Sequence, residues 1–279
     1  MNGEAPSSVR RALGSRFLRE SSTLSMGALF VAVSNLVGAV VMTHVLGAYE
    51  LSIFYLGVSS YSLLWALLNL GLANVVTKRI AAAIRSGSEE LIRGWMGVFV
   101  RLSVLLATVA FATGLLIFPF GAGLAFNEDS GRIAQLASAL VLVPLLDVPR
   151  IVCSAALQGE RRMSALARVD LGHELCRLIL VVSGALIFGD AWGAVLGLLV
   201  SSFCGSLIAF DAYGRERRRE GSLLPSLMGA ARSTSIPARA ALQEGVKVGL
   251  GRNVDSLGVQ TPPTLILGSL GDPGWVAYL

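Results

Sequence analysis

Hydrophobic residues in this chain gather in long runs that are separated by short polar segments. Each run is about 20 residues or longer, and as an α-helix rising about 1.5 Å per residue it spans the roughly 30 Å hydrocarbon core of a bilayer. A helix satisfies its backbone hydrogen bonds internally, as the membrane interior requires. The pattern therefore predicts seven transmembrane helices, at residues 24–46, 53–76, 96–119, 133–157, 169–188, 192–210 and 245–270.

The first two runs form a hairpin around Leu46-Gly47-Ala48, and the second run ends at the basic pair Lys78-Arg79. Small and polar side chains recur in the second run every three or four residues, so they share one helix face. Such a face packs against other helices or borders a water-filled space rather than lipid. These residues are Tyr55, Ser59, Ser62, Ala66, Asn69, Ala73 and Thr77.

A stripe of small residues runs along the sixth predicted helix. Its members are four residues apart and therefore lie on one face, where the absence of large side chains allows another helix to approach closely. We expect this face to contact a neighbouring helix. The stripe consists of Gly193, Gly197, Ser201, Gly205 and Ala209.

Basic residues are distributed unevenly among the connections between the runs. The N-terminus and segments 77–95, 158–168 and 211–247 carry 4, 4, 3 and 7 Lys and Arg residues, whereas the other three loops carry 0, 1 and 0. Loops rich in Lys and Arg stay on the cytoplasmic side of a membrane. The distribution predicts a multi-pass protein of the cytoplasmic membrane with a cytoplasmic N-terminus.

Composition agrees with a membrane protein. Of 279 residues, 54% are hydrophobic and 15% are charged, whereas a soluble domain has about 25% charged residues. The net charge of +5 would favour nucleic acid in a soluble protein, but these basic residues lie in alternate loops without interleaved aromatic residues, so no nucleic-acid partner is expected. Cys153, Cys176 and Cys204 lie singly in apolar runs, and two histidines do not complete a zinc site. We expect no metal and no cofactor.

These patterns divide the chain into four parts. Residues 1–23 form a basic N-terminus in which Val9, Leu13 and Phe17 recur every four residues, as in a short amphipathic surface helix. Residues 24–210 form a six-helix bundle, and residues 211–244 form a cytoplasmic linker with a short interfacial helix. Residues 245–279 begin a second bundle that is truncated.

The hairpin also carries a family resemblance. Val45-Leu46-Gly47 with Tyr49 and Phe54, followed by Leu68-Asn69-Leu70-Gly71-Leu72 and then Lys78-Arg79, resembles the start of bacterial polysaccharide flippases of the O-antigen type. These flippases belong to the superfamily that includes lipid II flippases and multidrug and toxin extrusion transporters. The resemblance extends from about Leu24 to the end of the chain, which would correspond to the N-terminal half of such a flippase. It implies transport of a polyprenyl diphosphate-linked glycan, and a second bundle supplied by further sequence, another chain or a second copy.

Ionisable residues occur inside several predicted helices, where a charge is costly and therefore indicates a function. At about 1.5 Å per residue they lie roughly 7 to 15 Å from the cytoplasmic ends, at depths comparable to Asn35 and Asn69. Together they predict one polar layer, whose arginines would hold an anionic headgroup. Its charged members are Arg101, Asp147, Arg150, Glu174, Arg177, Arg252 and Asp255.

Two interpretations of this layer remain open. The fourth and fifth helices are antiparallel, so we expect Asp147 to pair with Arg177, and Arg150 with Glu174, across the two helices. In the first interpretation these pairs only hold helices together. In the second they line a hydrated cavity, where Asn35, Asn69 and the four arginines bind substrate and Asp147, Glu174 and Asp255 order the arginines or couple transport to a cation or proton.

The most consistent function is translocation of lipid-linked oligosaccharide across the membrane for surface polysaccharide synthesis. A cation-coupled multidrug exporter of the same superfamily is one alternative, although an excess of arginine favours an anionic substrate. An integral membrane enzyme of envelope synthesis is another, but the sequence contains no GxSxG, HExxH or P-loop motif, so an enzyme is not expected. A truncated, non-transporting fragment or partner subunit is the third.

Overall fold

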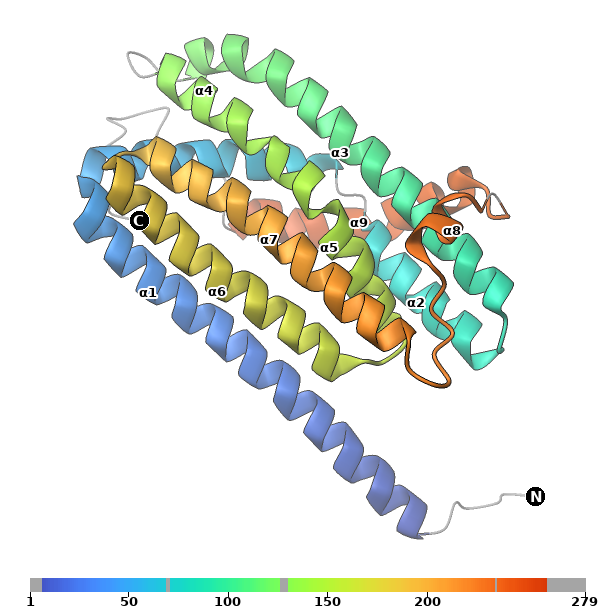
Figure 1. Ribbon diagram of the computed structural model, residues 1–279. Helices are drawn as coiled ribbons and strands as arrows, with labels where there is room; N and C mark the ends of the chain where they lie inside the picture. The colour runs from blue at the N-terminus through green and yellow to red at the C-terminus, as the bar shows by residue number, and fades with distance from the viewer. Residues whose placement is uncertain (1–6, 69–70, 126–129, 234, 260–279) are drawn as a thin grey trace.

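The computed structural model describes residues 7–68, 71–125, 130–233 and 235–259, and these residues form α-helices joined by short connections (Figure 1). Within these described ranges, five stretches are long and apolar enough to cross a membrane, and the first of them, Ser25–Ala66, contains both limbs of the predicted hairpin. The predicted all-α, polytopic helical bundle is confirmed. The helices are α1 Ser7–Leu68, α2 Leu72–Arg85, α3 Glu89–Ala125, α4 Ser130–Leu140, α5 Leu142–Gly159, α6 Met163–Phe188, α7 Ala191–Arg217, α8 Leu227–Ala231 and α9 Ala238–Val259.

Gly47 makes the hairpin that the sequence predicts. Its φ of 68° and ψ of 166° interrupt α1 and divide it into two limbs, in a backbone region that residues with a side chain rarely occupy. Three residues later, the Glu50 carboxylate accepts hydrogen bonds from the Arg132 guanidinium at 2.7 and 3.0 Å and from the backbone N–H of Ala191 at 2.9 Å. Glu50 therefore ties the hairpin to α4 and to the start of α7. We call this the hairpin end of the bundle.

The second predicted span is interrupted. The second limb of α1 ends at Leu68, and a new helix, α2, starts after Gly71, whose φ of 65° is left-handed. The sequence predicted that the second span ends at Lys78-Arg79, but this pair lies in the middle of α2, on its exposed side. On the opposite side of the helix, Val75, Val76 and Ile80 are buried. The sequence predicted that the small and polar residues form one continuous face, but in the structure this face is divided between two helices.

The other predicted spans are present with different ends. The fourth is divided into α4 and α5 at Val141, where Pro144 has no N–H to donate to the carbonyl of Leu140. In α3, α6 and α7 the helix extends beyond the apolar run into charged sequence. Residues from Ser7 onward continue directly into the first limb of α1, so the expected separate surface helix is not formed. The predicted seventh span at 245–270 overlaps α9 and otherwise lies outside the described residues.

The long helices lie side by side with α7 between α6 and α5, and α6 separates α7 from the first limb of α1 (Figure 1). Helix α3 runs beside α4 and α5, and α8 packs against α3. Helix α9 packs mainly against α2. We call the end of the bundle that carries the α2–α3 turn, the α5–α6 turn and the C-terminal end of α7 the basic end, because it carries most of the loop arginines.

The predicted small-residue stripe on α7 packs against α6, as expected. A Cβ added at Gly193 would lie 2.1 Å from the Gly184 carbonyl oxygen, and one added at Gly197 would lie 2.2 Å from the Leu180 carbonyl oxygen. Gly205 in turn lies against the ring of His173. The two backbones therefore touch around Gly193 and Gly197, which is possible only because side chains are missing there.

We predict that Gly197→Leu forces α6 and α7 apart, because its side chain would overlap backbone atoms that cannot move independently. Overpacking of this kind typically costs about 1–3 kcal/mol or more. Thermal unfolding in detergent measures the effect. Val200→Leu, on the exposed side of the same helix, is the matched control and should change stability little. If both variants were as stable as the parent, the close α6–α7 contact would be wrong.

Candidate functional site

A layer of polar side chains lies between two buried apolar clusters. One cluster joins α1, α4 and the first turns of α7 near the hairpin end, and the other joins α2, α3, α5 and the last turns of α7 near the basic end. Between them α7 carries Ser201, Ser202 and Ser206, all buried. Arg177 lies at the same level, about 21 Å along α6 from Met163 and about 17 Å from Phe188 at 1.5 Å per residue. Arg177 therefore lies near the middle of α6, further from the basic end of that helix than the roughly 7 to 15 Å expected from the sequence.

Two ion pairs lie in this layer, each within one helix. Arg150 donates to both oxygens of the Asp147 carboxylate at 3.1 and 2.7 Å, and Arg177 donates to Glu174 at 3.0 and 2.6 Å. Residues three apart share a helix face, so the long arginine side chain reaches back over one turn. Each charge is therefore partly neutralised by a residue of its own helix.

The predicted pairing across helices, of Asp147 with Arg177 and of Arg150 with Glu174, is wrong. Helix α7 lies between α5 and α6 over most of their length (Figure 1). The two pairs still influence each other, because Arg150 lies within electrostatic range of Asp170 and Glu174 on α6. The layer is a set of neighbouring short-range pairs rather than a cross-linked quartet.

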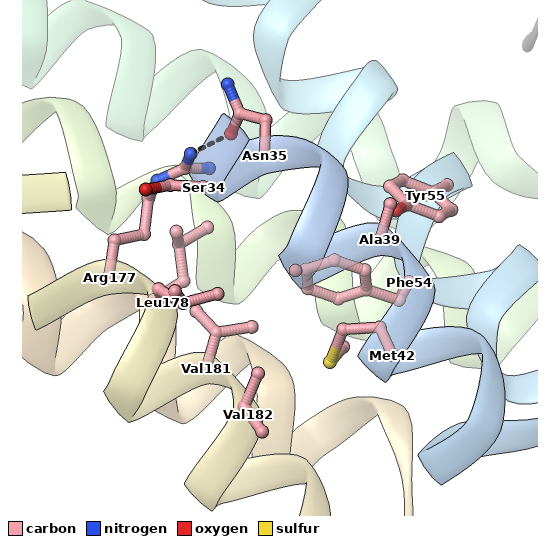
Figure 2. Close-up of a pocket in the computed structure, with 12 residues that line it drawn as sticks. Ser34, Asn35, Ala39, Met42, Phe54, Tyr55, Arg177, Leu178, Val181 and Val182 are labelled. Atoms are coloured by element: carbon pink, nitrogen blue, oxygen red, sulfur yellow. Dashed lines mark hydrogen bonds between the residues drawn. The ribbon is translucent and has the colours of Figure 1, made fainter. Parts of the chain in front are cut away.

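A cavity of about 690 Å³ lies between the two limbs of α1, α6 and α7. Arg177 and Asn35 lie at one side of it, where the arginine Nη2 donates to the Asn35 side-chain oxygen (Figure 2). Met42, Phe54 and Val182 line the part toward the hairpin end (Figure 2). The volume is within the range of about 300–1,000 Å³ that is usual for small-ligand pockets. The cavity therefore has one cationic side and one apolar side.

The Arg177 guanidinium has hydrogen-bond donors that the described residues do not use. Its Nε and Nη2 donate to Glu174, and Nη2 also donates to Asn35, but none of the hydrogen bonds among the described residues uses Nη1. The guanidinium side chain is 33% exposed and Glu174 is 15% exposed. The ring of Tyr55, on the opposite limb of α1, lies within electrostatic range of Arg177. An anion entering the cavity would find a cation that is already oriented by two neighbours.

The other candidate residues either lie away from this cavity or fall outside the residues that the structure describes. Arg101 on α3 donates back to the Gly97 carbonyl at 3.2 Å and does not line the cavity. Asn69 lies outside the described residues. Arg252 and Asp255 belong to the α9 backbone, but their side chains are outside the described part. The structure thus brings together Asn35, Glu174 and Arg177, with Asp147 and Arg150 nearby on α5.

Several cavity residues were not identified from the sequence. Ser34, Gly38 and Met42 are four residues apart on the first limb of α1, and this spacing was the available signal. Gly38 allows the close approach of α6, since a Cβ there would lie 3.2 Å from Cδ1 of Leu178. Asp170 is the second residue of the span predicted at 169–188, so the sequence placed it at the edge of the membrane. Because α6 begins at Met163, Asp170 instead lies inside the helix, within electrostatic range of Arg150.

Metal ligands do not gather in this region. Within the described residues there is no group of three or more His, Cys, Asp or Glu side chains that could hold a metal ion. The three cysteines are free thiols. The chemistry that these side chains offer is charge pairing and hydrogen bonding.

Comparison with known proteins identifies the family. A family model described as "Polysaccharide biosynthesis protein" matches residues 17–277. The chain belongs to this family. The resemblance seen in the hairpin is confirmed by a match that covers nearly the whole chain.

The chain also resembles a solved transporter in fold. The crystal structure of the eukaryotic MATE transporter AtDTX14 superposes with a TM-score of 0.58 at 16% sequence identity, over 92% of this chain and 58% of that chain. Identity this low supports only the shared fold. The chain spans 58% of the length of that transporter chain. No curated protein matches the sequence.

We predict that each arginine couples more strongly to the carboxylate on its own helix than to the carboxylate on the other helix. In a double-mutant cycle in detergent, Asp147→Asn with Arg150→Gln should show a coupling free energy of about 0.5–3 kcal/mol, as contacting residues do. Asp147→Asn with Arg177→Gln should show a smaller coupling, since these side chains form no ion pair. Unfolding monitored by denaturant or heat measures both cycles. A larger coupling free energy in the second cycle would contradict the pairing within each helix and support pairing across helices.

Proposed function

We propose that this protein translocates a lipid-linked oligosaccharide across the cytoplasmic membrane, and that residues 24–210 form one lobe of the transporter. The observation that carries the proposal is Arg177, an oriented and partly exposed guanidinium at the wall of a cavity inside the bundle. Membership of the polysaccharide biosynthesis family supports this substrate class. The N-terminus and the basic end would face the cytoplasm, according to the distribution of loop arginines.

The cavity suits a diphosphate attached to an apolar chain. A guanidinium presents paired donors to phosphate oxygens, and the Nη1 of Arg177 takes no other hydrogen bond among the described residues. The apolar side chains of Met42, Phe54 and Val182 would contact isoprenoid carbon atoms near the phosphate. In this proposal Asn35 and Arg177 bind the headgroup directly, and Glu174 holds the guanidinium in place until substrate arrives.

Arg150 would act as a second cationic group near the same level. It is 22% exposed and paired with Asp147, whereas Arg177 is 33% exposed and paired with Glu174, so Arg150 is the less accessible of the two. Arg101, Asn69, Arg252 and Asp255 remain candidates for the wall of a larger cavity completed by a second bundle. That bundle would be supplied by a second half or by another copy of this chain.

We predict that Arg177→Ala lowers glycan export at least ten-fold per folded molecule. Loss of a charge-assisted hydrogen bond typically costs about 1.5–3 kcal/mol, which corresponds to roughly ten-fold or more. Export is measured as surface glycan in cells whose own gene for this protein carries the substitution, and protein amount is measured by size-exclusion chromatography. Arg177→Lys should retain part of the activity, because the charge remains but the planar fork is lost.

Arg215→Ala is the matched control, because Arg215 is exposed, pairs with Asp211 and lies away from the cavity. It should export normally. Undiminished export by folded Arg177→Ala protein would eliminate the headgroup role. Efflux of cationic drugs with no glycan defect in any variant would support the multidrug exporter instead.

A further inference from the structure

The segment that follows α7 is fixed against the basic end of the bundle. The Tyr213 hydroxyl donates to the Pro225 carbonyl at 2.6 Å. The Glu160 carboxylate accepts from the Ser222 hydroxyl and from the Leu223 backbone N–H, both at 3.3 Å. Residues 222–226 therefore lie along the bundle in a defined path rather than as a free linker.

Helix α8 extends this attachment to α3. Gly97 lies so close to the linker that an added Cβ would be 2.2 Å from the Ala230 carbonyl oxygen. One turn earlier, a Cβ at Gly94 would be 2.4 Å from the Ser235 hydroxyl oxygen. Leu224 and Ala230 are buried. The linker thus docks into a notch that two glycines leave in α3.

A polar cleft of about 400 Å³ remains between the start of α3, the end of α7 and this docked linker. Its volume is again that of a small-ligand pocket. It is separate from the cavity that contains Arg177. Its lining consists of Glu89, Arg93, Arg217, Gly229 and residues 222–226.

The cleft carries a net positive charge. Arg93 and Arg217 contribute two guanidinium groups, and Glu89 contributes one carboxylate. Nearby arginines are engaged, since Arg215 pairs with Asp211 at 2.8 Å and Arg219 pairs with Glu216 at 3.0 Å. Among the described residues, no ion pair is formed by either of the two cleft arginines. Two cations without partners therefore face one small concave space.

We infer that this cleft binds a phosphate-bearing anion at the basic end of the bundle, held between Arg93 and Arg217. Arginine suits phosphate because its planar fork donates to two oxygens. The ligand would be the headgroup of an anionic phospholipid or a free phosphate ester, which present the same group. The Ser226 hydroxyl lines the cleft and accepts from the Gly229 backbone N–H at 3.1 Å, so its own O–H remains available to donate to a phosphate oxygen. The inference does not depend on the proposed transport function.

The test uses the 279-residue chain in nanodiscs of phosphatidylcholine with or without phosphatidylglycerol. Native mass spectrometry measures how much phosphatidylglycerol is retained, and glycerol 3-phosphate serves as the soluble probe. The test variant is Arg93→Gln with Arg217→Gln. The control, Arg215→Gln with Arg218→Gln, removes the same charge from exposed positions outside the cleft. Thermal unfolding confirms that both variants fold.

A hydrogen bond to the phosphate contributes about five-fold in binding, so the cleft variant, which loses two such donors, should lose roughly 25-fold. The control arginines do not line the cleft, so the control should lose about two-fold or less. Retention of phosphatidylglycerol by the parent identifies the headgroup as the source, whereas binding of glycerol 3-phosphate alone identifies a free phosphate ester. If the double variant unfolds, Arg93→Gln and Arg217→Gln singly should each lose about five-fold. Equal losses in cleft and control variants, or no loss in either, would overturn the inference.

Discussion

The close contact between α6 and α7 determines the rest of this structure. Glycines at 184, 193 and 197 let the two backbones touch, and Gly205 leaves room for the His173 ring, so α7 is held in the centre of the bundle and separates α5 from α6. The face of α6 next to this contact carries Glu174 and Arg177 and is turned toward the first limb of α1. A charged residue would be costly in lipid, but here Arg177 meets Asn35 and a half-open cavity between α1, α6 and α7. Helix packing thereby places the cation where an anion can reach it.

The polar layer is tolerated because its charges are neutralised locally. Each arginine reaches a carboxylate three residues away on its own helix, so the pair forms with the helix and does not depend on distant packing. Apolar clusters above and below the layer supply most of the buried contacts. This division separates stability from binding. The clusters and glycine contacts hold the bundle, and the layer between them keeps polar groups that can exchange partners.

Much of the fold could be predicted from the sequence, because membrane spans are long and the small-residue stripe has a fixed period. The Gly47 turn and the α7 stripe lie where the pattern placed them. The break at Gly71 was missed, because an apolar run on both sides hides a single left-handed glycine. The cross-helix pairing was wrong because sequence order does not show that α7 would lie between α5 and α6. Arg177 was identified as a charge inside a predicted span, and Asn35 by its comparable depth. The residues of α1 that complete the cavity are small or apolar and carry no chemical signal of their own.

The most direct test of the account is to ask whether substrate enters the cavity beside Arg177. A photoreactive amino acid at Leu178, which lines the cavity, would be compared with one at Ile179, which is 59% exposed on the outside of the same helix. After irradiation in membranes that contain the lipid-linked glycan, adducts are identified by mass spectrometry. The account predicts glycan-bearing adducts at position 178 and only bulk phospholipid adducts at position 179. Glycan-bearing adducts at 179 alone, or at neither position in folded and active protein, would contradict it.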